Sequence, residues 1–200
     1  GRVDGVSAIS RLQVWTQPLW LVMLVVPFVY VLLRDPGAFA GIVHYGGESG
    51  QGARFELPQF GAALTVGIAL ITQMGEQADY LRFMPDASKI GRWRWWTALL
   101  TTGPGWVFMG GIKLMAGSFL AYFALNHGLS ESSAAEPAEM FFVVFREMLG
   151  SPIVALVLTG VFVITCQLKI NVTNAYAGSI AWSNFFSRLT HAHPGRVVWL

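Results

Sequence analysis

The sequence predicts an all-α integral membrane protein. Of its 200 residues, 54% are hydrophobic and 12% are charged, whereas a soluble domain carries roughly 25% charged residues. A helix needs about 20 apolar residues to cross the hydrocarbon core, and four stretches meet that need, at about 14–33, 58–79, 95–125 and 152–186. The formal net charge of +2 is too small to favour nucleic acid as a partner, and the single cysteine excludes an internal disulfide framework.

The first two predicted spans differ in composition. The span at 14–33 is almost purely apolar, whereas the span at 58–79 is rich in Gly, Ala and Thr, which suits close helix packing. The second span turns polar from Thr72 onward, inside the membrane. Gly75 lies in this polar part, and we interpret it as a point where the helix breaks.

The third span and the segment after it carry interruptions. Gly103-Pro104-Gly105 divides the span at 95–125. The tryptophans at its start alternate with arginines and are typical of an interfacial anchor (Arg92, Trp93, Arg94, Trp95, Trp96). The segment at 138–149 is too short and too charged to span, and we predict an amphipathic helix that lies on the surface or caps the bundle.

The basic residues of the connecting segments predict the orientation. Eight lie before span one, between spans two and three, and after span four (Arg2, Arg11, Arg82, Lys89, Arg92, Arg94, Arg188, Arg196), against three in the other connections (Arg34, Arg54, Arg146). By the positive-inside rule, both ends of the chain are expected in the cytoplasm and the helix at 138–149 outside. We therefore expect a multi-pass protein of the cell inner (plasma) membrane.

A polar stretch runs through the fourth span, from Thr165 to Asn184, without glycine or proline until Gly178. Lys169 stands out in it, because a lysine deep in a span is rare and tends to pair or to line a pathway. One interpretation is that Lys169 snorkels to the cytoplasmic boundary. The other is a fixed positive charge inside the bundle, with Glu76 of span two as its partner.

Amide and carboxylate side chains are the candidate solute ligands. Asn171 and Asn174 are three residues apart and share a helix face, from which Lys169 points away. The two amides either join helices by hydrogen bonds or recognise a planar polar ligand. Together with the polar residues before and after Gly75, where a broken helix would bind substrate, they form the predicted substrate site (Thr72, Gln73, Glu76, Asn171, Asn174).

Other charged and metal-ligating residues favour structural roles. Asp79 and Arg82 are predicted to form an interfacial ion pair. Lys113 is interpreted as a second buried lysine, explained by a structural pair or by a tilted span. The two imidazoles at 191 and 193 alone do not make a metal site. Because no phosphate loop, catalytic triad or cysteine cluster occurs in the sequence, we predict neither an enzyme nor a bound cofactor.

Three segments resemble the nucleobase:cation symporter-1 family of purine, cytosine, allantoin and hydantoin permeases. The first is Gly5-Val6-Ser7-Ala8-Ile9-Ser10-Arg11-Leu12 followed by Pro18-Leu19, similar to the entry into helix five. The second is Ala78-Asp79-Tyr80-Leu81-Arg82-Phe83, similar to the signature that ends helix six. The third, Asn174-Ala175-Tyr176 through Ser183-Asn184, looks like helix eight of the cytosine-permease relatives.

The resemblance implies a leucine-transporter-like inverted-repeat fold, of which this chain would supply about helices five to eight of twelve. In such a fold helices one and six are unwound, and the solute lies between helices one, three, six and eight. The chain begins without Met, and another apolar run begins near Val197. We therefore expect an internal fragment of a larger membrane protein.

Two positions depart from the family pattern. Where sodium-coupled members place hydroxyls on helix eight, the cation-site positions of this sequence are Cys166, Lys169 and Ile170. An ammonium offers sodium no oxygen ligand, so we hypothesise that Lys169 is a built-in cation and that the protein works without sodium. Where members place a Trp or Phe on helix six to stack on the base, this sequence has Leu70.

The predicted function is secondary transport of a nucleobase-like or other small nitrogenous solute across the lipid bilayer, with coupling to sodium or a proton left open. The alternative is a permease-like sensor module of a membrane histidine kinase, in which the missing sodium hydroxyls and stacking aromatic would be tolerated. A purely structural bundle fits the charges and amides of the spans less well.

Overall fold

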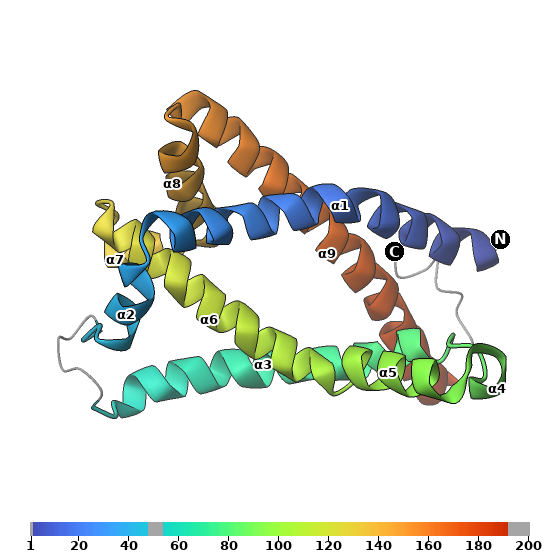
Figure 1. Cartoon of the computed structure of the whole chain (residues 1–200). Helices are drawn as coiled ribbons and strands as arrows, with labels where there is room; N and C mark the ends of the chain where they lie inside the picture. Colours follow the sequence, from blue (N-terminus) through green and yellow to red (C-terminus); the bar gives the residue numbers. More distant parts are fainter. Residues whose placement is uncertain (1, 48–53, 192–200) are drawn as a thin grey trace. The chain divides into compact units, whose positions relative to one another are not determined.

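A computed structural model describes residues 2–47 and 54–191, the side chains of residues 2–7, 69–76, 79 and 80 excepted. The regular structure in these ranges is α-helical, with no strand among the described residues (Figure 1). Three helical segments are long and apolar enough to cross a membrane: Ala8–Arg34, Gly105–Asn126 and Pro152–Thr190. The prediction of an all-α protein embedded in a membrane is thus confirmed at this level.

The chain divides into two compact units, Gly1–Ile42 with Phe119–Leu200 and Val43–Ser118. The elements of the first unit are α1 (Arg2–Arg34), α2 (Gly37–Val43), α7 (Glu131–Ala134), α8 (Pro137–Leu149) and α9 (Pro152–Thr190). Those of the second are α3 (Leu57–Leu81), α4 (Ala87–Ile90) and α5 (Arg92–Thr102), and α6 (Gly105–Asn126) runs from the second unit into the first.

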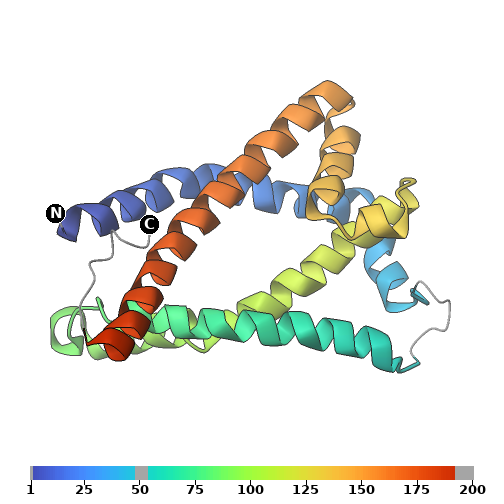
Figure 2. The same cartoon turned by 180° about the vertical axis from the view of Figure 1, so that it is seen from behind.

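The core of the first unit lies where α1, α8 and α9 meet. Figures 1 and 2 both show α9 crossing α1, with α8 beside the N-terminal part of α9. Phe141 of α8 joins the three helices, because its ring centroid lies 4.5 Å from that of Phe162 in α9 and 6.2 Å from that of Phe28 in α1. Aromatic pairs at such separations contribute about 0.5–1.5 kcal/mol beyond the area that they bury.

The predicted helix at 138–149 is observed as α8, which packs against α1 and α9. Its apolar side chains are buried on more than one face (Met140, Phe141, Val143, Val144, Phe145). Gly150 ends the helix with φ 66°, and its N–H donates to the carbonyl of Arg146 at 2.8 Å. The hydroxyl of Tyr30 in α1 donates to the carbonyl of Glu147 at 3.0 Å and ties α8 to α1.

A stripe of buried side chains runs along α9. Its members recur at intervals of three and four residues or their sums (Ala155, Thr159, Phe162, Lys169, Ala177, Ile180), which keeps one face of a helix toward its neighbours. Ser151 caps the helix, since its hydroxyl accepts a hydrogen bond from the N–H of Val154, and Pro152 occupies the first turn. The 39 residues of α9 are more than a bilayer requires.

Two helix breaks were expected in the second unit, at Gly75 and at Gly103-Pro104-Gly105, and only the second is observed. The backbone of α3 is helical through Gly75, so the expected break at this residue is wrong. An isolated glycine costs a helix only about 1 kcal/mol. The third predicted span, in contrast, consists of two helices that separate at Gly103 and Pro104, because proline has no N–H and its ring clashes with the carbonyl four residues before it.

Candidate functional site

Lys169 and the oxygens around its ammonium form the centre of the candidate site. The side chain is 9% exposed and points from α9 toward α1. Its Nζ donates to Gln17 Oε1 at 2.9 Å, to Thr16 Oγ1 at 3.2 Å and to the carbonyl of Gln13 at 3.3 Å. The three protons of the ammonium thus have three acceptors on one neighbouring helix.

A second set of contacts holds the two helices in register at the same level. Gln13 Nε2 donates to the carbonyl of Lys169 at 3.1 Å, so these two residues bond each other in both directions. The indole of Trp20 lies 5.6 Å from the ammonium and donates through Nε1 to the sulfur of Cys166 at 3.2 Å. The cation–π contact adds a favourable electrostatic term to the ammonium.

The acceptors of the Lys169 ammonium are all neutral. No carboxylate whose side chain the structure describes pairs with it. Removing a charge from water costs several kcal/mol, which a buried ion recovers only with well-placed partners. The ammonium is therefore held by the dipoles of neutral groups on α1.

The predicted partner of Lys169 was Glu76, and the structure gives Lys169 partners on α1 instead. The side chains of Glu76, Thr72 and Gln73 lie outside the described residues, as does that of Leu70. Their proposed roles toward a solute therefore remain predictions.

Two amide side chains of α9 lie on the opposite side of the helix from Lys169. Asn171 and Asn174 are both exposed in the chain, and neither amide has a hydrogen-bond partner among the described residues. At about 100° per residue these two side chains point about 140–160° away from Lys169. Gln167, four residues before Asn171, is exposed on the same side.

The three predicted cation-site positions separate in the structure. Cys166 and Lys169 face α1, where the indole of Trp20 contacts both. Ile170 is 49% exposed and faces away from that contact. Of the three positions, Cys166 and Lys169 therefore contribute to the contact between α1 and α9.

Two charged side chains outside the α1–α9 contact lie against aromatic rings. Lys113 of α6 is exposed in the chain, and its ammonium lies 4.5 Å from the ring of Trp106, seven residues earlier on the same helix. The guanidinium of Arg82 lies 4.9 Å from the ring of Phe83. The side chain of Asp79, its predicted ion-pair partner, lies outside the described residues.

The α1 half of the site does not stand out in the hydropathy of the sequence. Gln13, Thr16, Gln17 and Trp20 precede or open the apolar run, and a hydropathy profile treats them as the edge of a span. Their spacing of three and four residues is the signal that places them on one helix face. A polar stripe at that spacing on one helix, opposite a lysine on another, would have indicated the pair.

Comparison with protein-family models, with curated proteins and with solved structures gives no match to this chain. The contacts within the chain are therefore the basis for any functional conclusion.

Proposed function

We propose that the chain is part of a secondary transporter for a small nitrogenous solute of the nucleobase or amide type. The observation that carries this proposal is the division of α9 into two polar faces. The Lys169 ammonium on one face donates three hydrogen bonds to α1, whereas the amides of Asn171 and Asn174 on the other have no hydrogen-bond partner among the described residues. The two amides of the second face therefore keep hydrogen-bonding capacity for a ligand.

The chemistry of the amide face favours a planar ligand with both donors and acceptors. Each amide offers two N–H donors and one carbonyl acceptor in one plane. Amides are costly against hydrocarbon, so at membrane depth they are expected to face a partner helix or a water-filled path. A ureide, an amide or a pyrimidine ring presents the complementary pattern along one edge.

The α1 face of α9 supports transport without sodium. Carbonyl, hydroxyl and amide oxygens are the ligands that a hard cation requires, and here Gln13, Thr16 and Gln17 direct such oxygens at Lys169. The ammonium already occupies them. In the family that the chain resembles, helix eight forms the sodium site together with helix one. In this chain α9, which corresponds to helix eight, instead contacts α1, which corresponds to helix five.

We also propose a topology of four membrane spans for this chain. α3 would add a fourth span to the three long apolar helices, since the apolar segment Leu57–Ile68 is only the described part of a 25-residue helix. The four helices would then form part of an inverted-repeat, leucine-transporter-like fold of the nucleobase:cation symporter-1 type. Both ends would face the cytoplasm of a cell bounded by the inner (plasma) membrane, and no enzymatic step is proposed.

Uptake of radiolabelled solutes by cells that express the full-length protein tests the proposal. The panel contains purines, pyrimidines and hydantoins, each measured in sodium and in choline buffer. We expect uptake of at least one solute, equal in both buffers. Dependence on sodium would refute the role given to Lys169, while leaving transport itself standing.

Three variants separate the two faces of α9 in this assay. Asn171→Leu should weaken uptake mainly through KM, because it removes a ligand contact, and Lys169→Met should lower uptake of every solute in both buffers. Asn184→Leu is the matched control, since Asn184 is an exposed amide of the same helix at a different angle. Equal losses for Asn171→Leu and Asn184→Leu would contradict the assignment of the amide face.

The same panel distinguishes the sensor alternative. A permease-like sensor would bind a solute in equilibrium dialysis without moving it across the membrane. Binding that Asn171→Leu weakens, together with no uptake of any panel member, would favour the sensor over the transporter.

A further inference from the structure

An open recess of about 340 Å³ lies beside the first turns of α5 and is lined by Arg92, Trp93 and Trp96. Two tryptophans make most of its wall apolar, and Arg92 is the charged residue of the lining. An apolar wall with one cation suits an amphiphile with an anionic head better than a small free anion, which needs several donors.

One face of α5 is cationic at its N-terminal end and apolar toward its C-terminal end. Arg92, Trp96 and Leu100 follow one another at intervals of four residues and therefore share a face. Trp96 is 45% exposed and Leu100 is 53% exposed. Eight residues of helix measure about 12 Å, so the face changes from cationic to apolar over about the distance from a lipid phosphate to its upper acyl chain.

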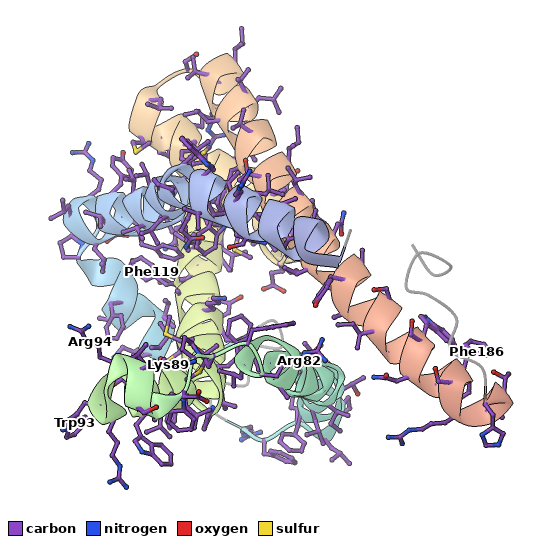
Figure 3. All side chains as sticks on the ribbon, turned by 90° about the vertical axis from the view of Figure 1, so that its right-hand side faces the viewer. Arg82, Lys89, Trp93, Arg94, Phe119 and Phe186 are labelled. Carbon is purple, nitrogen blue, oxygen red and sulfur yellow. The ribbon has the colours of Figure 1, made fainter. Side chains whose placement is uncertain are left out.

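The arginines of this helix have no carboxylate partner in the described part of the chain. Arg92 and Arg94 are exposed and make no ion pair there. Lys89 of α4 has one, because its Nζ lies 3.6 Å from Asp86, although both side chains are mostly exposed. Figure 3 shows Trp93 and Arg94 leaving α5 on different sides, so Arg94 does not share the recess.

We propose that Arg92, Trp93 and Trp96 of α5 form a binding site for an anionic phospholipid. The phosphate accepts hydrogen bonds from the Arg92 guanidinium, and an acyl chain lies against Trp96 and Leu100. Tryptophan is enriched at the headgroup level of membranes, and basic residues beside a membrane helix attract anionic lipid. The site is independent of solute transport, because it uses none of the residues of the α1–α9 contact.

Native mass spectrometry of the purified protein in detergent tests the site. Phosphatidylglycerol and phosphatidylcholine with the same acyl chains are added separately, and the lipid-bound fraction is measured at each concentration. We expect phosphatidylglycerol to bind more tightly. Arg92→Gln should weaken its binding about fivefold, since one basic residue near an anionic surface contributes about 1 kcal/mol.

Arg94→Gln is the matched control. It removes the same charge two residues away and leaves the recess unchanged, so its effect on phosphatidylglycerol binding should stay below about twofold. Equal losses in the two variants would mean general attraction by a basic segment and would overturn the site. Both arginines are exposed, and equal thermal unfolding midpoints would establish that both variants are folded.

Two further outcomes would overturn the proposal. Displacement of phosphatidylglycerol by millimolar inorganic phosphate would show that the recess binds a free anion. Dimers that disappear in Trp96→Ala, with lipid binding unaltered, would show that a second copy of the chain covers this face. Lipid binding that resists phosphate and falls in Trp96→Ala supports the proposed site.

Discussion

The two lysines of the membrane helices meet opposite surroundings. Lys169 of α9 is buried and bonded to three oxygens of another helix, whereas Lys113 of α6 is exposed and contacts the ring of Trp106 on its own helix. The first arrangement couples two helices, and the second is self-contained. A buried charge can thus join elements of a membrane protein without a counter-ion, provided that a neighbouring helix supplies oxygens at the right spacing.

Removing the closest acceptor of Lys169 should have the largest effect. Gln17→Leu takes away the 2.9 Å bond and leaves part of a buried ammonium unsatisfied, which should lower the free energy of unfolding by about 1.5 kcal/mol. Unfolding in mixed micelles with a denaturing detergent measures the change. In a Lys169→Met background the same substitution should cost much less, because no charge remains; equal costs in both backgrounds would show that the bond contributes nothing.

A smaller effect is expected for Thr16→Val. The hydroxyl of Thr16 accepts from Lys169 at 3.2 Å but also donates to the carbonyl of Leu12 at 2.7 Å within α1. Valine keeps the shape, and the loss should be about 0.5–1 kcal/mol in the same unfolding assay. A loss larger than that of Gln17→Leu would reverse the assignment of the main acceptor.

The smallest effect should follow from Lys113→Met. An exposed cation–π contact contributes about 0.5–1 kcal/mol, and the apolar replacement offsets part of that loss in a micelle. We expect a change within about 0.5 kcal/mol. A destabilisation as large as that of Gln17→Leu would remove the contrast between the two lysines and would indicate a partner for Lys113 outside the described residues.

Helix positions followed from the sequence better than helix pairing did. α8 and the start of α9 lie within one residue of their predicted positions, because Pro137, Gly150 and Ser151 mark their ends locally. α1 begins about a dozen residues before its predicted span, since hydropathy finds the apolar part of a helix and not its polar extension.

The partner of Lys169 could not be derived in this way. Glu76 carries the charge opposite to that of Lys169, whereas the structure satisfies the ammonium with neutral oxygens from Gln13, Thr16 and Gln17. Which helices are neighbours depends on packing across the whole unit, as at Phe141, and not on the residues of either helix alone. The break at Gly103 and Pro104 was predictable because proline acts within its own helix turn.

The length of α9 gives the Lys169 contact a mechanical consequence. The helix runs without interruption from Lys169 to Thr190, and 21 residues of α-helix measure about 31 Å. Were α9 to rotate as a rigid rod by about 5° about its contact with α1, its C-terminal end would move by about 3 Å. A small change in the hydrogen bonds between the Lys169 ammonium and α1 would then displace the C-terminal end of α9 by about the diameter of a water molecule.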